Sequence, residues 1–256
     1  MTYFAAFLLV TLSAAGAGVA SWLVGQLFTV DARRRHHEVG APVFQQIGVM
    51  FSVLLAFVFS EVWGEYRTAG LAINGECGAL HVAAMLASAL PNGEGQPVTR
   101  AIATYAKTVV NVEWPMMANR ERSPQAAEAL HTALRQAANL QDASPVTVAI
   151  QAEVVSLLAQ AHSFRETRTF QLSQGMPPLM WFMLIAISLV LIGFVVCAGL
   201  ENPGHVLFAA IFTGSTVLVL VLVRMLDFPF EGALALPSTD FVKLLGEVSA
   251  LVRAGS

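Results

Sequence analysis

The sequence has few charged residues, few cysteines and no strong excess of either charge. Only 12% of its 256 residues are charged, about half the share of an ordinary soluble domain, and the mean hydropathy is +0.65. These values exclude an ordinary soluble protein and indicate an integral membrane protein. A net charge of −3 offers no basic face for a phosphate backbone, so nucleic acid is not an expected partner.

The motifs of common enzyme classes are also missing. The chain has no glycine-rich phosphate loop, no GxSxG elbow, no CxxC pair and no His-Glu metal helix. Cys77 and Cys197 lie in very different surroundings, which predicts two free thiols. The adjacent His36, His37 and Glu38 are interpreted as part of a solvated loop. The remaining histidines lack metal-ligand spacing; they are His81, His131, His162 and His205. We therefore expect no catalytic residue, no metal, no cofactor and no enzymatic activity.

Four long apolar segments predict an all-α integral membrane protein with four transmembrane helices. A helix needs about 20 apolar residues to cross the hydrocarbon core; the predicted spans are residues 3–30, 43–63, 179–200 and 206–226. A cleavable signal peptide is the alternative for the first segment, but no lysine or arginine precedes it. The expected location is the bacterial inner membrane, with the lipid bilayer as a partner.

Between the second and third spans lies a long insert of more polar composition. Proline, glycine and serine signals divide it into four amphipathic helices, which predicts an extramembrane bundle. The second span is expected to continue into the first of these helices, before a break at 91–97. The predicted parts are a transmembrane hairpin (1–63), the insert (64–176), a second hairpin (177–230) and an amphipathic tail (231–256).

Helical periodicity and capping signals predict details of the insert. Ser123 and Ser144, each followed by proline, are expected helix N-caps. Pro115 is expected to disturb the second helix. The tail is expected to lie on the membrane surface or to pack on the bundle. The predicted faces are Ile102, Tyr105, Val109, Val112 and Met116; Ala127, Leu130, Leu134 and Ala137; Val148, Ala152, Val155, Ala159 and His162; and Phe241, Leu244, Leu245, Val248 and Leu251.

The spans themselves carry small residues at helical spacing. In the first span Ala14, Gly18, Ser21 and Gly25 form a stripe that lets another helix approach closely. The short polar segment 31–42, about a dozen residues long, is expected to form the loop to the second span.

The second span has a small or hydroxyl residue at every fourth position: Gly48, Ser52, Ala56 and Ser60. This stripe, or the bulky face that holds Phe51, Phe57 and Phe59, is a candidate lining for a narrow oligomeric pore.

Three ionisable residues lie near the ends of spans, where a charge is costly unless it is paired or wet. These are Glu61, Arg224 and Asp227. In one interpretation Arg224 pairs with Asp227 while Glu61 meets headgroups. In the other, all three gather at one mouth of a polar pathway.

Four segments in order along the chain resemble a bacterial family of bestrophin-like membrane proteins. They are GVMFSVLLAFVFSEVWGEY (48–66), YAKTVVNVEWPMM (105–117), PPLMWFMLI (177–185) and LDFPFEG (226–232). The second span is also similar, more remotely, to the bestrophin helix that lines the neck of a pentameric ion channel. The resemblance implies a homo-oligomeric channel for small inorganic ions, with a neck near Phe51, Leu55 and Phe59. No acidic cluster resembles the calcium clasp of animal bestrophins.

Two questions stay open at this point. Arg33, Arg34 and Arg35 favour a cytoplasmic loop between the first two spans, whereas the bestrophin arrangement would place the insert in the cytoplasm. The leading functional hypothesis is an ion channel whose candidate lining is Gly48, Phe51, Ser52, Leu55 and Phe59. The alternative is a membrane-anchored helical sensor or scaffold that binds a ligand or protein through the 64–176 bundle.

Overall fold

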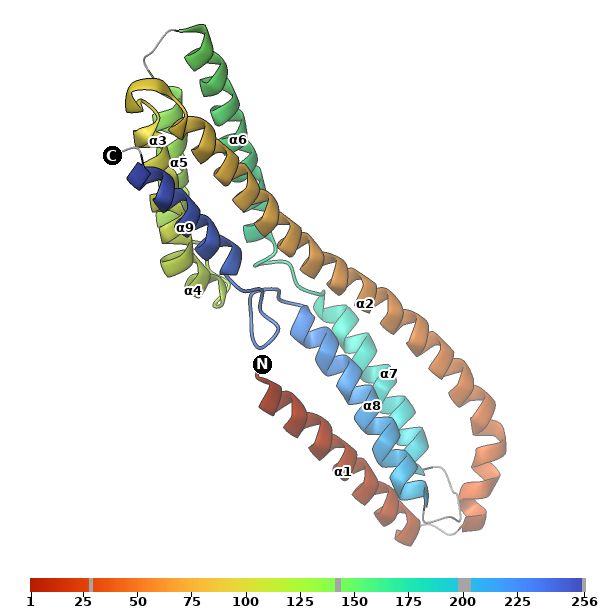
Figure 1. The fold of residues 1–256 in the computed structure, drawn as a ribbon. Helices are drawn as coiled ribbons and strands as arrows, with labels where there is room; N and C mark the ends of the chain where they lie inside the picture. The colour runs from red at the N-terminus through yellow and green to blue at the C-terminus, as the bar shows by residue number, and fades with distance from the viewer. Residues whose placement is uncertain (28–29, 141–143, 198–203, 255–256) are drawn as a thin grey trace. The chain divides into compact units, whose positions relative to one another are not determined.

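The computed structural model describes residues 1–27, 30–140, 144–197 and 204–254. Regular structure in these ranges is helical throughout, which confirms the all-α prediction (Figure 1). The predicted four spans are also confirmed as helices long and apolar enough to cross a membrane. They are α1 (Tyr3–Leu27), α2 (Val30–Ser88) from Gly40 onward, α7 (Pro178–Cys197) and α8 (Gly204–Leu226).

The chain divides into two compact units. We call residues 1–64 and 175–227 the membrane unit, and residues 65–174 and 228–256 the bundle unit. Helix α2 contributes residues to both. Each unit is described separately below.

In the membrane unit, α1 packs closely along α8 through small residues (Figure 1). A Cβ atom at Gly18 would lie 3.5 Å from Val206 Cγ1, and one at Gly214 would lie 3.3 Å from Ala14 Cβ. Ala14 and Gly18 of the small stripe predicted in the first span therefore pack against α8, whereas Gly25 of the same stripe is exposed. Such contacts let the two backbones approach without a bulky side chain between them.

The predicted polar loop at 31–42 is wrong, because the backbone is helical from Val30 onward. Helix α2 runs through this segment and contains Pro42 within it. The segment has charged and small residues that tolerate a helix, and its proline removes only one backbone donor. The polar composition of the segment therefore does not mark a chain break. The connection between α1 and α2, at 28–29, lies outside the described residues, as does the predicted turn at 201–205 except for its last two residues.

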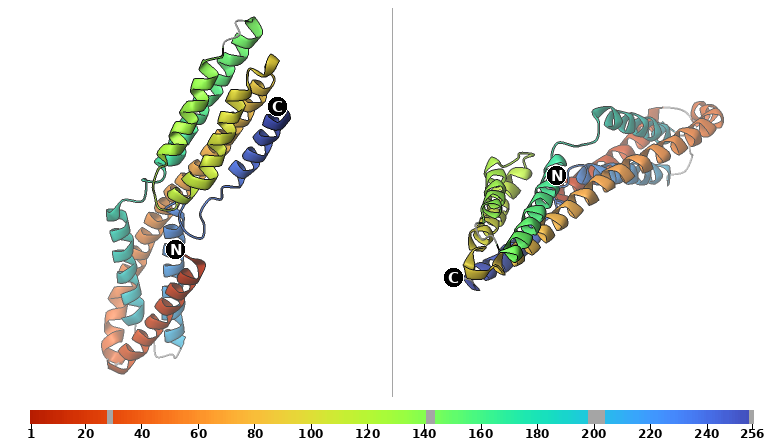
Figure 2. Two further views of the ribbon diagram at one scale, coloured as in Figure 1. Left: turned by 90° about the vertical axis from the view of Figure 1, so that its left-hand side faces the viewer. Right: turned by 90° about the horizontal axis from the view of Figure 1, so that it is seen from above.

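The bundle unit contains the rest of α2, the helices between residues 91 and 170, and α9. Helix α3 lies between α5 and α9, and α5 packs on α6 (Figure 2). The bounds are η1 (Pro91–Gly93), α3 (Gln96–Thr108), the π-helix η2 (Val109–Glu113), α4 (Trp114–Met117), α5 (Pro124–Ala138), α6 (Pro145–Phe170) and α9 (Thr239–Ala254).

Both predicted serine caps are confirmed. The Ser123 hydroxyl accepts a hydrogen bond from the Ala126 amide at 3.2 Å, and Ser144 accepts one from Thr147 at 3.2 Å. Each cap satisfies an amide that has no partner within its own helix.

We expect Ser123→Ala to lower the free energy of unfolding by about 1 kcal/mol, because it removes a cap from a buried helix start. Ser156→Ala, at an exposed position in the interior of α6, is the matched control and should change stability little. Thermal melts of the detergent-solubilised protein give the comparison. Equal melting temperatures for the two variants would show that the cap contributes nothing.

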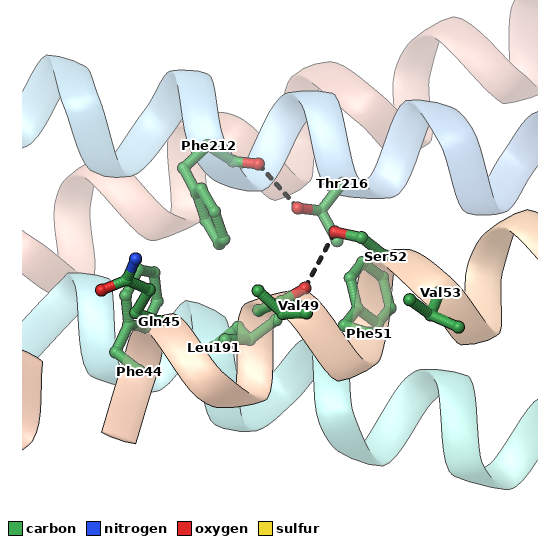
Figure 3. A pocket seen from close by; sticks show the side chains of 10 residues that line it. Phe44, Gln45, Val49, Phe51, Ser52, Val53, Leu191, Phe212 and Thr216 are labelled. Atoms are coloured by element: carbon green, nitrogen blue, oxygen red, sulfur yellow. Dashed lines mark hydrogen bonds between the residues drawn. The ribbon is translucent and has the colours of Figure 1, made fainter. Parts of the chain in front are cut away.

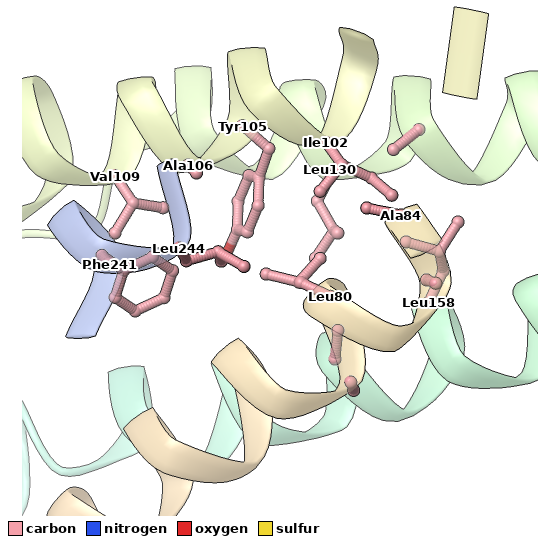
Figure 4. Close-up of a cluster of buried hydrophobic side chains, with 14 of the residues drawn as sticks. Leu80, Ala84, Ile102, Tyr105, Ala106, Val109, Leu130, Leu158, Phe241 and Leu244 are labelled. Atoms are coloured by element: carbon pink, nitrogen blue, oxygen red, sulfur yellow. The ribbon is translucent and has the colours of Figure 1, made fainter. Parts of the chain in front are cut away.

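The core of the bundle unit follows the predicted pattern until the π-helix (Figure 4). Ile102, Tyr105 and Val109 are fully buried as predicted. Within η2 the Trp114 amide donates to the Val109 carbonyl five residues back, which inserts one residue into the helical register. After it the buried positions are Glu113 and Met117, each one residue later than the predicted Val112 and Met116.

The predicted face of α6 is wrong as a buried face. Val148 is 50% exposed, and Ala152 and Ala159 are also exposed. Alanine and valine occur on several sides of α6, so apolar spacing alone does not select one side. The buried side combines the apolar residues Val154, Leu158 and Ala161 with four polar or charged ones, which are Thr147, Arg165, Arg168 and Thr169.

The other two predicted faces fit better. Leu130 and Ala137 of α5 are fully buried. The tail forms α9 and packs on the bundle, with Phe241, Leu244 and Val248 buried. Of the two placements considered for the tail, packing on the bundle is therefore the one observed.

Candidate functional site

The small-residue stripe of α2 lies on a face of the membrane unit that no other part of that unit covers. Ser52, Ala56 and Ser60 are exposed, and Gly48 is half-buried with no atom within 4 Å of a Cβ built on it. The Ser52 hydroxyl donates to the Gly48 carbonyl at 2.8 Å. This bond satisfies the hydroxyl within its own helix, as an apolar environment requires.

The bulky residues of the same segment are distributed differently. Phe51 is 9% exposed, Leu55 and Phe59 are half-buried, and Phe57 is 71% exposed. The Phe59 ring stacks on Trp63 with centroids 6.5 Å apart and an interplanar angle of 7°. Within one subunit, the stripe of small residues is thus more exposed than the face of α2 that holds Phe51.

A groove of about 480 Å³ lies between α2, α7 and α8 of the membrane unit (Figure 3). Three of the predicted lining residues, Gly48, Phe51 and Ser52, contribute to its walls. On the opposite side the Thr216 hydroxyl donates to the Phe212 carbonyl at 2.9 Å. The hydroxyls that face this groove are therefore bonded to backbone, and the walls are mainly apolar.

The predicted ionisable residues are in different environments. Asp227 is 2% exposed; its carboxylate accepts from the Met176 amide at 2.8 Å and from the Trp181 indole at 3.3 Å. It therefore holds the start of α7. Glu61 is exposed and Arg224 is half-buried. A shared mouth for these three residues stays a prediction, and so does pairing of Arg224 with Asp227.

Sequence reasoning missed a buried charge network in the bundle unit. The Arg168 guanidinium donates to Glu76 at 2.8 Å and to Glu113 at 2.8 Å, and Arg165 pairs with Glu113. The Tyr105 hydroxyl donates to Glu76. The positive charges of two arginines thus equal the negative charges of two glutamates, in a site where the four side chains are at most 5% exposed. Such a site is stable only when every charge is paired.

The network changes the proton affinities of its members. Burial, followed by the nearby Glu76 carboxylate, raises the pKa of Tyr105 well above its ordinary value. Burial alone would lower the pKa of Arg168, but Glu76, Tyr105 and Glu113 raise it well above its ordinary value. Tyr105 is therefore a neutral donor and Arg168 a permanent cation at physiological pH.

A second groove, of about 300 Å³, lies between α2 and α9 within the bundle unit and contains Cys77. On its rim His81 Nδ1 lies 3.1 Å from a Glu247 oxygen. Burial and the Glu76 carboxylate raise the pKa of the Cys77 thiol to about 12, so it stays protonated at neutral pH. Both cysteines are free, as predicted.

The histidines give no metal centre within the described part of the chain. The rings of His131 and His162 lie 5.8 Å apart, a proximity that their sequence spacing does not reveal. No group of three histidine, cysteine or acidic side chains among the described residues is placed to hold a metal ion. The predicted loop histidines His36 and His37 lie outside the residues whose side chains are described.

Comparison with known proteins connects this architecture to one family. The family model described as Bestrophin-like domain matches residues 11–241. The chain belongs to the bestrophin-like family. The resemblance of the four sequence segments to bestrophin-like proteins is therefore confirmed. No curated protein matches the chain.

Solved structures of a bacterial bestrophin homolog from Klebsiella pneumoniae share the fold. A point mutant of that protein has a TM-score of 0.73 at 12% identity, covering 96% of this chain and 98% of the other. The form solved by Zn-SAD phasing also has a TM-score of 0.73 at 12% identity, covering 94% and 98%. At this identity the match shows the bestrophin fold alone.

Proposed function

We propose that this bestrophin-like protein is an oligomeric ion channel of the bacterial inner membrane, with a pathway for small ions along α2. The observation that carries the proposal is the open stripe of small and hydroxyl residues on α2, in a chain of the bestrophin-like family. Small side chains leave room for ions beside the helix, and serine hydroxyls are milder barriers to them than bulky apolar groups.

The exposure of the stripe also supports a pathway built from several copies of the chain. A pathway must be enclosed on all sides, whereas Ser52 and Ser60 are exposed in the single subunit. Copies arranged by a rotation axis would place the same helix face around a common centre. The apolar residues beside the stripe, Met50, Val53 and Phe57, are each more than half exposed and would be covered by neighbouring subunits or by lipid.

Among the candidate lining residues, burial favours the small stripe over the aromatic face. Ser52 is exposed, whereas Phe51 packs inside the subunit at 9% exposure. We therefore propose that Gly48, Ser52 and Ser60 face the pathway, while Phe51 supports α2 from behind. Leu55 and Phe59, which are half-buried, lie at the border between the two faces.

Ion flux from liposomes tests this assignment. Ser60→Trp should plug the pathway and reduce flux by at least about tenfold, because a bulky apolar ring in a narrow pore excludes water and ions. Phe57→Trp, at another exposed position of the same helix, is the matched control and should conduct normally.

Two further variants decide between the faces. Phe51→Ala and Phe59→Ala should leave single-channel conductance nearly unchanged if the small stripe lines the pathway. A large rise in conductance from either variant, with no effect of Ser60→Trp, would assign the pathway to the aromatic face instead. A monomer or dimer in native mass spectrometry, with no flux, would favour the sensor or scaffold alternative.

A further inference from the structure

The groove between α2, α7 and α8 of the membrane unit has uncharged, mainly apolar walls. None of the described residues that line it is ionisable. The Ser52 and Thr216 hydroxyls on its two sides are bonded to backbone carbonyls of their own helices (Figure 3). A polar ligand would therefore lose its hydration in this groove without regaining as many hydrogen bonds. The walls favour an apolar ligand.

The groove is continuous with the apolar outer surface of the spans. Val49 and Val53 line it and are themselves 55% and 51% exposed, so it opens outward from the unit. On the other two helices, Val190 of α7 and Phe208 of α8 are 55% and 62% exposed. Lipid tails are as apolar as these side chains. A tail can therefore pass from the bilayer into the groove without crossing a polar surface.

The size of the groove and the residues at one end suit a single lipid chain. A methylene group occupies nearly the same volume as a water molecule in the liquid, about 30 Å³, so a groove of about 480 Å³ holds one acyl chain rather than a whole lipid. At one end Phe44 stacks on Phe194, with ring centroids 4.8 Å apart, and lies 6.0 Å from Phe212. Gln45 lies at the same end (Figure 3) and is exposed.

We propose that this groove binds one acyl chain of a membrane phospholipid, with the ester end at Gln45 and the methyl end toward Val53. The Gln45 side chain carries an amide donor, and the carbonyl of a lipid ester accepts hydrogen bonds. The inference concerns lipid binding and does not require that the protein conducts ions. Gly48 and Ser52 line the groove as well as the proposed pathway, so a bound chain would narrow the pathway at that level.

Photolabelling in phosphatidylglycerol nanodiscs tests the proposal. A small share of the lipid carries a diazirine on one acyl chain, and mass spectrometry locates its adducts after irradiation. In the wild type, adducts should form at Phe51 and Leu191, which line the groove and are only 9% and 2% exposed. Adducts at the exposed Phe208 serve as the internal reference for lipid around the spans.

Two variants should lower the adducts in the groove relative to those at Phe208. Gly48→Trp should do so severalfold, because Gly48 lines the groove and no atom lies within 4 Å of a Cβ built on it, so the indole would fill the space. Gln45→Leu, a milder change at an exposed position, removes the contact with the ester and should have a smaller effect. Gly16→Trp is the matched control, because Gly16 is exposed on α1 with equally open space around its Cβ. It should keep the wild-type pattern.

The outcomes separate this inference from the proposed function. If the wild type is labelled at Phe208 but not at Phe51 or Leu191, the groove is closed to lipid, as it would be if a second copy of the chain filled it, and the proposal is wrong. Equal labelling of the groove in the wild type, Gly48→Trp and Gln45→Leu would also overturn it. If the groove is labelled as expected but the wild type passes no current, the proposed function fails and lipid binding stands.

Discussion

Replacing Gly95 with alanine is expected to lower the free energy of unfolding of the bundle unit by about 3 kcal/mol, the upper end of the usual cost of overpacking. Gly95 is the residue just before α3. A Cβ atom there would lie 1.7 Å from the Ala87 carbonyl oxygen and 2.5 Å from its carbon. Both are backbone atoms of α2, so no side-chain rotation can relieve the clash. Either α3 must move away from α2, or the turn between them must unfold.

Gly246→Ala is the matched control for this prediction. Gly246 lies inside α9 in the same unit, and a Cβ built on it meets no atom within 4 Å. Alanine there should raise stability by about 0.5–1 kcal/mol, because it removes the entropy cost of glycine in a helix. Thermal unfolding in detergent should move the two melting temperatures in opposite directions. Similar melting temperatures for both variants would contradict the close approach at Gly95.

Replacing Arg168 with methionine is expected to cost about 3–5 kcal/mol, the usual cost of breaking a buried ion pair from one side. Methionine leaves Glu76 and Glu113 buried without their shared cation. It also removes the guanidinium that lies 5.3 Å from the Phe241 ring and 5.5 Å from the Trp114 ring. Loss of these contacts should weaken the docking of α9 as well as the network.

The control for Arg168 is Arg135, whose pairing with Glu128 is exposed on the surface. Arg135→Met should cost less than about 1 kcal/mol. The double variant Arg168→Met with Glu76→Gln should recover part of the lost stability, because it removes one uncompensated buried charge. If Arg168→Met costs no more than Arg135→Met, the network does not support the bundle.

The features that sequence predicted well depend on short-range signals. Ser123 and Ser144 precede prolines, and each forms the expected cap because the signal and its effect lie within one helical turn. The close approach at Gly18 follows from small residues at helical spacing. The four spans are predicted from the length and apolarity of their segments alone, because the thickness of the hydrocarbon core sets how many apolar residues a span needs.

The features that sequence missed depend on partners far apart in the chain. Glu76 and Arg168 are separated by 92 residues, and neither lies in a motif that predicts burial. The single residue inserted by the π-helix shifts the buried face from Val112 to Glu113, and periodicity assumes a constant register. The composition of the charged segment 31–42 predicts a loop, although its backbone is helical.

The candidate site shows the same division. The sequence singled out one segment of α2 as the candidate lining, but could not decide which of its faces was exposed, because that depends on where α7 and α8 pack. The groove beside Phe51 and the exposure of Ser52 supply that information for one subunit. The hypothesis that Asp227 lies at a pathway mouth must now account for its hydrogen bonds to Met176 and Trp181.

Single-channel recording of the purified wild-type protein in planar bilayers tests the central claim most directly. If α2 lines an ion pathway, the protein should give discrete current steps that reverse at a defined potential under a salt gradient, and Ser60→Trp should abolish them. A correctly folded, oligomeric protein that gives no current under any ion gradient would contradict the account.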